Sequence, residues 1–147
     1  MIDNLKVKGD LEIVVRDKDG KVKDNRQVNN LVVNTGLNYI ASRIISNVEN
    51  VMSHMAIGTG TTAPNASDTA LVSIAGARET IDSISITDNA IKYTAIFEAG
   101  NQSGDITEAG IFNALTGGSM LCRTTFSAVT KGSNDTLTIA WTITVSA

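Results

Sequence analysis

The chain has 147 residues, of which 42% are hydrophobic and 18% charged, and its formal net charge is −3. This length fits one domain with a substantial core, and the negative charge leaves no basic field that would attract nucleic acid. The single cysteine, Cys122, excludes an intramolecular disulfide and a thiolate metal cluster, which fits a reducing compartment. The first eight residues lack the apolar run of a secretory signal, and no apolar stretch is long enough to cross a bilayer.

The first predicted element is a β-hairpin over residues 5–28. Apolar and polar residues alternate through its first half, as in a half-buried strand, and Gly9 there suggests a bulge. Asp19 and Gly20 suit the positive φ of a tight turn. A calcium loop is the alternative interpretation, but Val28 stands where such a loop needs a bidentate glutamate. We therefore expect a hairpin, and one able to act as an arm.

A single helix is predicted next, over about residues 36–47, with Asn34 or Thr35 as its N-cap. Six apolar residues fall on one face at helical spacing: Leu37, Ile40, Ala41, Ile44, Ile45 and Val48. About a dozen residues are too few for an isolated helix to be stable. We therefore expect this apolar stripe to pack against a sheet.

The other predicted strands are apolar or alternating runs separated by clusters of Gly, Ser, Asn and Asp. They cover residues 51–57, 78–86, 91–97, 106–112, 120–126 and 137–145. Residues 58–71 are an ordered loop, and no Gly-Lys-Ser/Thr follows to make it a phosphate loop. In the last strand, apolar residues alternate with Thr and Ala, so one face is buried and the other is a threonine ladder.

Short turns between these runs exclude the crossovers that parallel strands need. The predicted fold class is therefore mainly β. We expect one domain over residues 1–147, an antiparallel β-sandwich or jelly-roll-like fold of eight or nine strands with one short packed α-helix.

Residues with catalytic chemistry are sparse, and none lies in a motif. The candidates are His54, Cys122, Asp68, Glu79, Glu98, Asp105 and Glu108. With one histidine and one cysteine, a metal site would need mainly carboxylate ligands, so a structural role is favoured for both residues. We assign no catalytic, cofactor-binding or metal residue, and we expect no enzymatic activity and no cofactor.

Glu108 is the acid of greatest interest because apolar strand residues flank it. Such a carboxylate should point to solvent or be paired, and Arg123 on the next strand is its candidate partner. The prediction is a structural cross-strand ion pair. An exposed pair of this kind is worth a few tenths to about 1 kcal/mol.

Several segments resemble small structural proteins of tailed-bacteriophage virions. They are residues 30–37, 55–60, 62–64, 68–71, 93–97, 106–113, 120–126 and 135–143, beginning with Asn-Leu-Val-Val-Asn-Thr-Gly-Leu and Met-Ala-Ile-Gly-Thr-Gly. The similarity covers roughly residues 30–145 and extends to capsid decoration (cement) proteins and to attachment modules of tail and baseplate fibres. Its motifs are strand and turn signatures, so it transfers no functional residue.

The resemblance implies a non-enzymatic virion structural protein. The favoured expectation is a homotrimeric capsid decoration protein, assembled in the host cytoplasm, that stabilises the head from its outer surface by binding major capsid subunits. The hairpin over residues 5–28 or the loop over residues 58–71 would reach to the shell. A tail, baseplate or tail-fibre adaptor is the alternative. A carbohydrate-binding β-sandwich is less favoured because few aromatic residues remain for sugar platforms. We expect no nucleic-acid, membrane or small-molecule partner.

Overall fold

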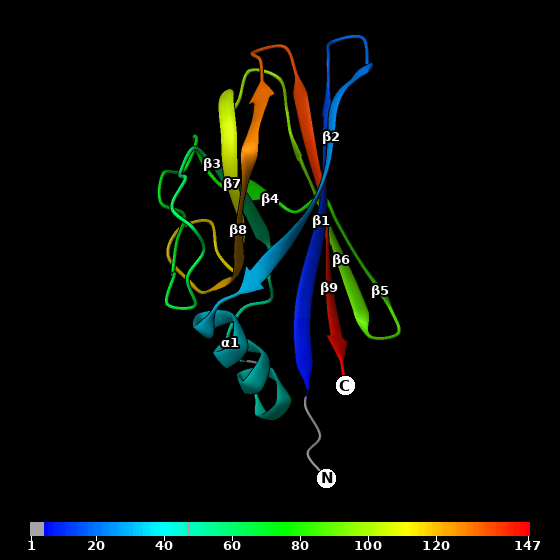
Figure 1. Ribbon diagram of the computed structural model, residues 1–147. Coiled ribbons are helices and arrows are strands. Elements are labelled where there is room, and N and C mark those ends of the chain that lie inside the picture. Colours follow the sequence, from blue (N-terminus) through cyan, green and yellow to red (C-terminus); the bar gives the residue numbers. More distant parts are fainter. Residues whose placement is uncertain (1–4, 47) are drawn as a thin grey trace.

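A computed structural model describes residues 5–46 and 48–147 of the chain. Within them the chain forms nine antiparallel strands and one α-helix (Figure 1). The elements are β1 (Lys6–Arg16), β2 (Val22–Val32), α1 (Asn34–Ile45), β3 (His54–Gly58), β4 (Glu79–Thr80), β5 (Ser83–Thr87), β6 (Ala90–Phe97), β7 (Gly104–Phe112), β8 (Met120–Lys131) and β9 (Thr136–Ser146). The predicted mainly β fold class is confirmed.

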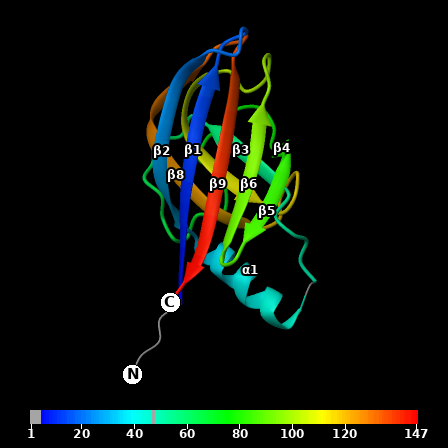
Figure 2. The same cartoon turned by 90° about the vertical axis from the view of Figure 1, so that its right-hand side faces the viewer.

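The nine strands make one curled sheet in the order β4-β3-β7-β8-β2-β1-β9-β6-β5. Strands β2, β1, β9, β6 and β5 form a five-strand layer, which faces the viewer in Figure 2. Strands β8, β7, β3 and β4 form a four-strand layer behind it. Apolar side chains from both layers meet in a shared core, so the arrangement is sandwich-like.

Two segments form the corners between the two layers. Strand β2 pairs with β1 for most of its length, and its last two residues, Leu31 and Val32, pair with β8. On the opposite side β4 pairs with β3, whereas β5 pairs with β6. The sequence predicted one strand over residues 78–86, but the structure divides it at Ile81, whose side chain is buried between the two pairings. Strands that change layer in this way form the corners of a sandwich.

The predicted hairpin lies in the middle of the sheet. Its turn has Gly20 at a φ of 82°, and the Asp17 carboxylate accepts the backbone N–H groups of Asp19 and Lys21 at 2.9 and 3.0 Å. Strand β1 pairs along its whole length with β9, and from Gly9 to Arg16 it also pairs with β2. The hairpin is therefore an integral part of the sheet, and its action as an arm stays a prediction.

Gly9 does not mark the predicted bulge, because the register of β1 with β9 is continuous across it, and the pairing of β1 with β2 begins at this residue. A Cβ atom at this position would collide with the side chain of Asn30. The Asn30 Oδ1 atom accepts a hydrogen bond from the buried Trp141 Nε1 at 3.1 Å. Gly9 thus leaves room for a polar contact of the largest fully buried side chain.

The alternation predicted for the last strand is confirmed in β9. Its apolar residues Leu137, Ile139, Trp141 and Ile143 are at most 2% exposed. The intervening threonines and alanine are half-buried. The apolar face of β9 lies in the shared core.

Helix α1 does not use the predicted N-cap. It already includes Asn34 and Thr35, and no described side chain caps its first turn. The Thr35 hydroxyl instead donates to the backbone oxygen of Met120 in β8 at 2.7 Å. Gly36 packs so closely on the carbonyl of Leu121 that a Cβ atom would collide with it. The first turn of the helix is therefore fixed to β8.

The face that α1 turns to the sheet also differs from the prediction. Gly36 and Tyr39 are buried and Ile40 is half-buried. Most of the predicted stripe is exposed: Leu37 (46%), Ile44 (78%), Ile45 (89%) and, beyond the helix, Val48 (88%). Residue 47, the predicted end of the helix, lies outside the described residues.

Candidate functional site

Glu108 of β7 and Arg123 of β8 form the ion pair that the sequence predicted. Glu108 Oε2 lies 3.0 Å from Arg123 Nε and 2.9 Å from Nη2. The two residues are diagonal neighbours, because Arg123 is in register with Gly110. Both side chains are 0% exposed, so this is a buried pair and not an exposed one.

The Glu108 carboxylate also binds the backbone of the loop that follows β3. Its Oε1 atom accepts the N–H groups of Gly60 at 3.0 Å and Ser73 at 2.7 Å. Its Oε2 atom accepts the N–H of Val72 at 3.0 Å. One carboxylate therefore holds both ends of the loop.

Arg123 binds the middle of the same loop. Its Nη1 atom donates to Asp68 Oδ2 at 3.0 Å, and its Nη2 atom donates to the backbone oxygen of Thr62 at 2.9 Å. The sequence suggested that the loop over residues 58–71 could reach to a capsid shell. In the structure it lies fixed against its own sheet.

Burial alone would raise the pKa of the Glu108 carboxyl. The three backbone donors and the Arg123 guanidinium outweigh burial and hold this pKa below its ordinary value. Glu108 is therefore ionised, with its oxygens engaged by structural donors. Such a group is poorly suited to general acid catalysis, which needs a carboxyl that keeps its proton near neutral pH.

The loop covers a small apolar cluster on the outer face of the four-strand layer. The cluster consists of Val33, Ala56, Phe112 and Met120, with Leu71 of the loop packed against it. This face of the sheet is thus covered by the chain's own loop.

The other sequence candidates are dispersed and have structural contacts. His54 Nδ1 lies 2.8 Å from the hydroxyl of Ser53, and Glu79 accepts a hydrogen bond from Gln102. Asp105 accepts one from Thr130, whereas Glu98 is exposed. Cys122 is completely buried, and burial raises the pKa of its thiol well above the ordinary value, so it stays protonated.

Sequence reasoning missed two buried charged groups near one end of the sheet. Lys131 is 1% exposed and donates to the backbone oxygens of Glu98 and Asn101 at 2.9 and 2.7 Å. Asp135 lies 2.6 Å from Lys23, and this contact is the main reason why the pKa of its carboxyl is lowered. Their only sequence signal is their position beside the turn that joins β8 to β9. Both fix turns.

Among the described residues there is no group of three or more His, Cys, Asp or Glu side chains placed to hold a metal ion. The described part of the chain also has no helix with the length and apolar character needed to span a bilayer.

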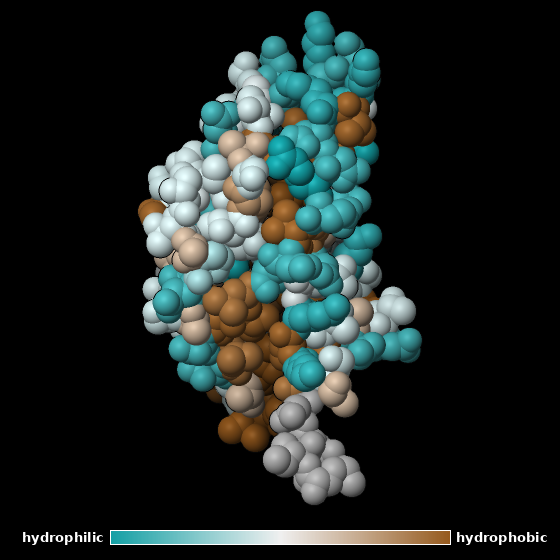
Figure 3. All heavy atoms as spheres, in the orientation of Figure 1, coloured by the Kyte–Doolittle hydropathy of each residue, from teal (hydrophilic) through white to brown (hydrophobic). Residues whose placement is uncertain are grey.

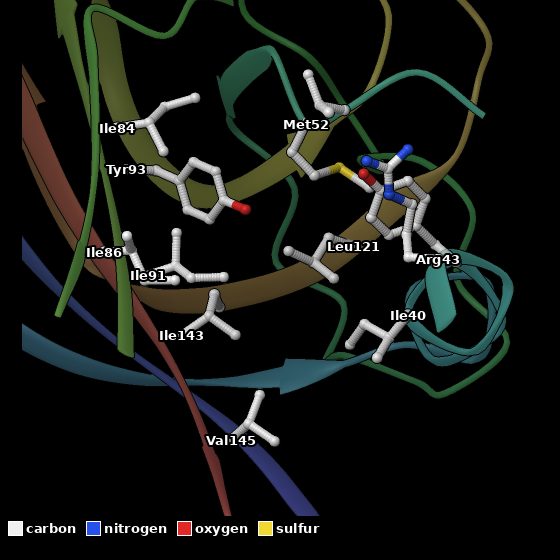
Figure 4. Close-up of a pocket in the computed structure, with 12 residues that line it drawn as sticks. Ile40, Arg43, Met52, Ile84, Ile86, Ile91, Tyr93, Leu121, Ile143 and Val145 are labelled. Atoms are coloured by element: carbon white, nitrogen blue, oxygen red, sulfur yellow. The ribbon is translucent and has the colours of Figure 1, made fainter. Parts of the chain in front are cut away.

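An apolar cleft of about 510 Å³ lies between α1 and the inner side of the five-strand layer (Figure 4). Helix α1 contributes Ile40 and Arg43 to one wall. Strands β5, β6 and β9 supply the opposite wall, with Ile84, Ile86, Ile91, Tyr93, Ile143 and Val145. Burial raises the pKa of Tyr93 to about 12, as expected for a phenol in apolar surroundings.

The rim of the cleft is unusually exposed for large aliphatic side chains. Ile84 and Ile86 are 53% and 73% exposed, and Val51 is 56% exposed. Figure 3 shows hydrophobic surface gathered over α1 and beside it, at the end opposite the mostly hydrophilic hairpin tip. The sequence identified these residues as apolar but did not predict their exposure. Periodicity identifies an apolar face and does not indicate whether another part of the chain covers it.

Comparisons of the chain with protein-family models, with curated proteins and with solved structures found no match. The resemblance to phage virion proteins therefore stays a prediction from the sequence pattern.

Proposed function

We propose that this chain is a non-enzymatic structural protein of a tailed-bacteriophage virion. Within the virion we propose a capsid decoration protein that binds major capsid subunits on the outer surface of the head. It would stabilise the head by burying surface against its neighbours.

The observation that carries this proposal is the exposed apolar end of the molecule. The cleft and the exposed part of α1 lie at this end, and large apolar patches on a folded chain mark interaction sites. The opposite end, at the β1–β2 turn, is mostly hydrophilic (Figure 3). A protein with one exposed apolar end and one hydrophilic end is suited to binding a larger assembly through the apolar end.

The chemistry of the buried ion pair supports a structural role over a catalytic one. Besides pairing with each other, Glu108 and Arg123 hold the loop through the contacts given above. A carbohydrate-binding module is disfavoured by the aromatic side chains. Trp141, Phe97, Phe112, Tyr39 and Tyr93 are all buried, whereas sugar binding uses exposed aromatic platforms.

The test is to purify phage particles that carry the chain, to separate emptied heads from tails, and to measure its copy number against the major capsid protein. We expect many copies in a fixed ratio to the capsid protein, all staying with heads. Copies that travel with tails would instead identify a tail, baseplate or fibre component. Absence of the chain from both fractions would refute a virion role.

A further inference from the structure

The apolar end of the molecule combines a concave and a convex surface. The concave part is the cleft between α1 and the five-strand layer. The convex part is the end of α1 and the residue beyond it, where Ile44, Ile45 and Val48 are 78 to 89% exposed. We call these three residues the helix knob. Both surfaces are aliphatic, so each offers what the other would bury.

The cleft is large enough to receive several aliphatic side chains. Its volume of about 510 Å³ falls in the range of sites that bind a ligand or an anchoring residue. Its walls are apolar apart from the hydroxyls of Tyr39 and Tyr93 and the guanidinium of Arg43, whose Nη1 atom donates to the backbone oxygen of Glu49 at 3.1 Å. Ile40, which is half-buried, lies in the wall on the same helix that carries the knob.

A molecule does not fill its own cleft with its own knob, because α1 is a wall of the cleft and is fixed to β8 at its first turn. The Thr35 hydroxyl bond and the close contact of Gly36 with Leu121 hold this position. The knob therefore stays outside the cleft of its own chain. A second copy presents both surfaces in the same way.

The exposed apolar area is large enough for a weak association between copies. Six side chains of the knob and the cleft rim are more than half exposed: Ile44, Ile45, Val48, Val51, Ile84 and Ile86. In a heterologous contact one copy contributes only its knob, on the order of 400 Å², and the other only its cleft, against about 800 Å² per partner in a standard protein interface, so we expect the association to be weak. A single folded chain rarely leaves so much aliphatic surface open.

We propose that the cleft binds the helix knob of a second copy of this chain. The contact joins two different surfaces, so it is heterologous and closes into a ring when the rotation between copies allows. The proposal names the self-interface of the virion protein proposed above. It is tested on the purified chain, so it stands or fails separately from the location of the protein in a virion.

The experiment is sedimentation velocity of the full chain at concentrations that extend into the high micromolar range. Three variants are compared with the parent: Ile45→Lys in the knob, Ile86→Lys at the cleft and Val22→Lys as the control. Val22 is also an exposed aliphatic, 48% exposed, but it lies at the hairpin end. Because all three side chains are largely exposed, the variants should fold, and circular dichroism verifies this.

We expect the parent and the Val22 variant to associate, and the knob and cleft variants to sediment as monomers. An equal mixture of the knob and cleft variants should form a heterodimer, because one intact knob then meets one intact cleft. A parent that stays monomeric would overturn the proposal. The same holds if the monomer binds only the major capsid protein, or only an added amphiphile such as dodecanoate. Association lost in the cleft variant but kept in the knob variant would also overturn it, since that result indicates pairing through the β5 edge.

Discussion

The molecule has two apolar regions outside its main core, and its own chain covers only one of them. On the outer face of the four-strand layer, the chain covers the cluster around Phe112 with its own loop and fixes that loop with Glu108 and Arg123. At the α1 end, the cleft and the helix knob are left open. The buried ion network thus fixes the loop over the first region, whereas the second region carries the interface that we propose for a second copy.

The largest expected effect on stability comes from disrupting the loop-covered region around Phe112, which we call the closed region. Replacing Glu108 by Ala should lower the free energy of unfolding by about 3–5 kcal/mol, because Arg123 and three backbone donors lose their partner inside the protein. Urea unfolding measures the loss. Asp105→Asn is the matched control on the same strand, exposed, with an expected change under about 0.5 kcal/mol. Equal effects from the two substitutions would contradict a closed region held by Glu108.

A smaller effect is expected where α1 meets β8. Gly36→Ala places a methyl group against the Leu121 carbonyl, so the helix must shift, at a cost of about 1–3 kcal/mol. Asn38→Ala, on an exposed position of the same helix, should leave stability unchanged or slightly improved. Thermal unfolding of both variants distinguishes a packing constraint from helix propensity. No difference between them would mean that the first turn does not fix the helix.

Acid should loosen the closed region. The Glu108 pKa is lowered in the folded protein, so its stabilising contribution is complete above the ordinary glutamate pKa of about 4.3 and is lost as pH falls through the lowered folded value. We expect urea midpoints of the parent to fall more steeply below about pH 5 than those of Glu108→Gln. Parallel pH profiles would show that Glu108 titrates normally.

Alkali should act on the cleft instead. The Tyr93 pKa is raised to about 12 in the folded protein, so its contribution is complete below the ordinary tyrosine pKa of about 10 and is lost as pH rises through 12. At pH 11 the loss relative to neutral pH should be about 1 kcal/mol, and Tyr93→Phe should reduce it. Absorbance titration of the phenol provides the measurement. Ionisation of Tyr93 near pH 10 would mean that the cleft is more hydrated than the structure indicates.

The smallest effect on stability is expected at the helix knob. Ile45→Ser removes a side chain that is 89% exposed, so the free energy of unfolding of the monomer should change by less than about 0.5 kcal/mol. A loss above about 2 kcal/mol at low protein concentration would show that Ile45 packs within its own chain. Urea unfolding in dilute solution separates these outcomes from effects on association.

The sequence was most informative where one pattern determines both an element and its environment. Alternation in β9 predicted its buried face, and Asp19-Gly20 predicted the hairpin turn, because both depend on neighbouring residues alone. The Glu108–Arg123 pair was predicted from strand neighbours as well. Its burial was not, because burial depends on the path of a loop that returns from elsewhere in the chain.

The helix shows the limit of periodicity. Leu37, Ile44 and Ile45 share a face as predicted, yet that face is exposed, because spacing identifies an apolar face but not what covers it. The predicted cap failed for a related reason. The pattern predicts that the Thr35 hydroxyl caps the helix locally, but the hydroxyl binds a distant strand.

Amide hydrogen exchange at low and high protein concentration tests the contrast between the two regions most directly. The amides of Gly60, Val72 and Ser73, which are bound by Glu108, should be protected to the same degree at both concentrations. The amides of α1 and β5 should gain protection as concentration rises, because a second copy covers them. Protection of α1 and β5 that is independent of concentration, or a loop that exchanges as fast as an open segment, would contradict the account.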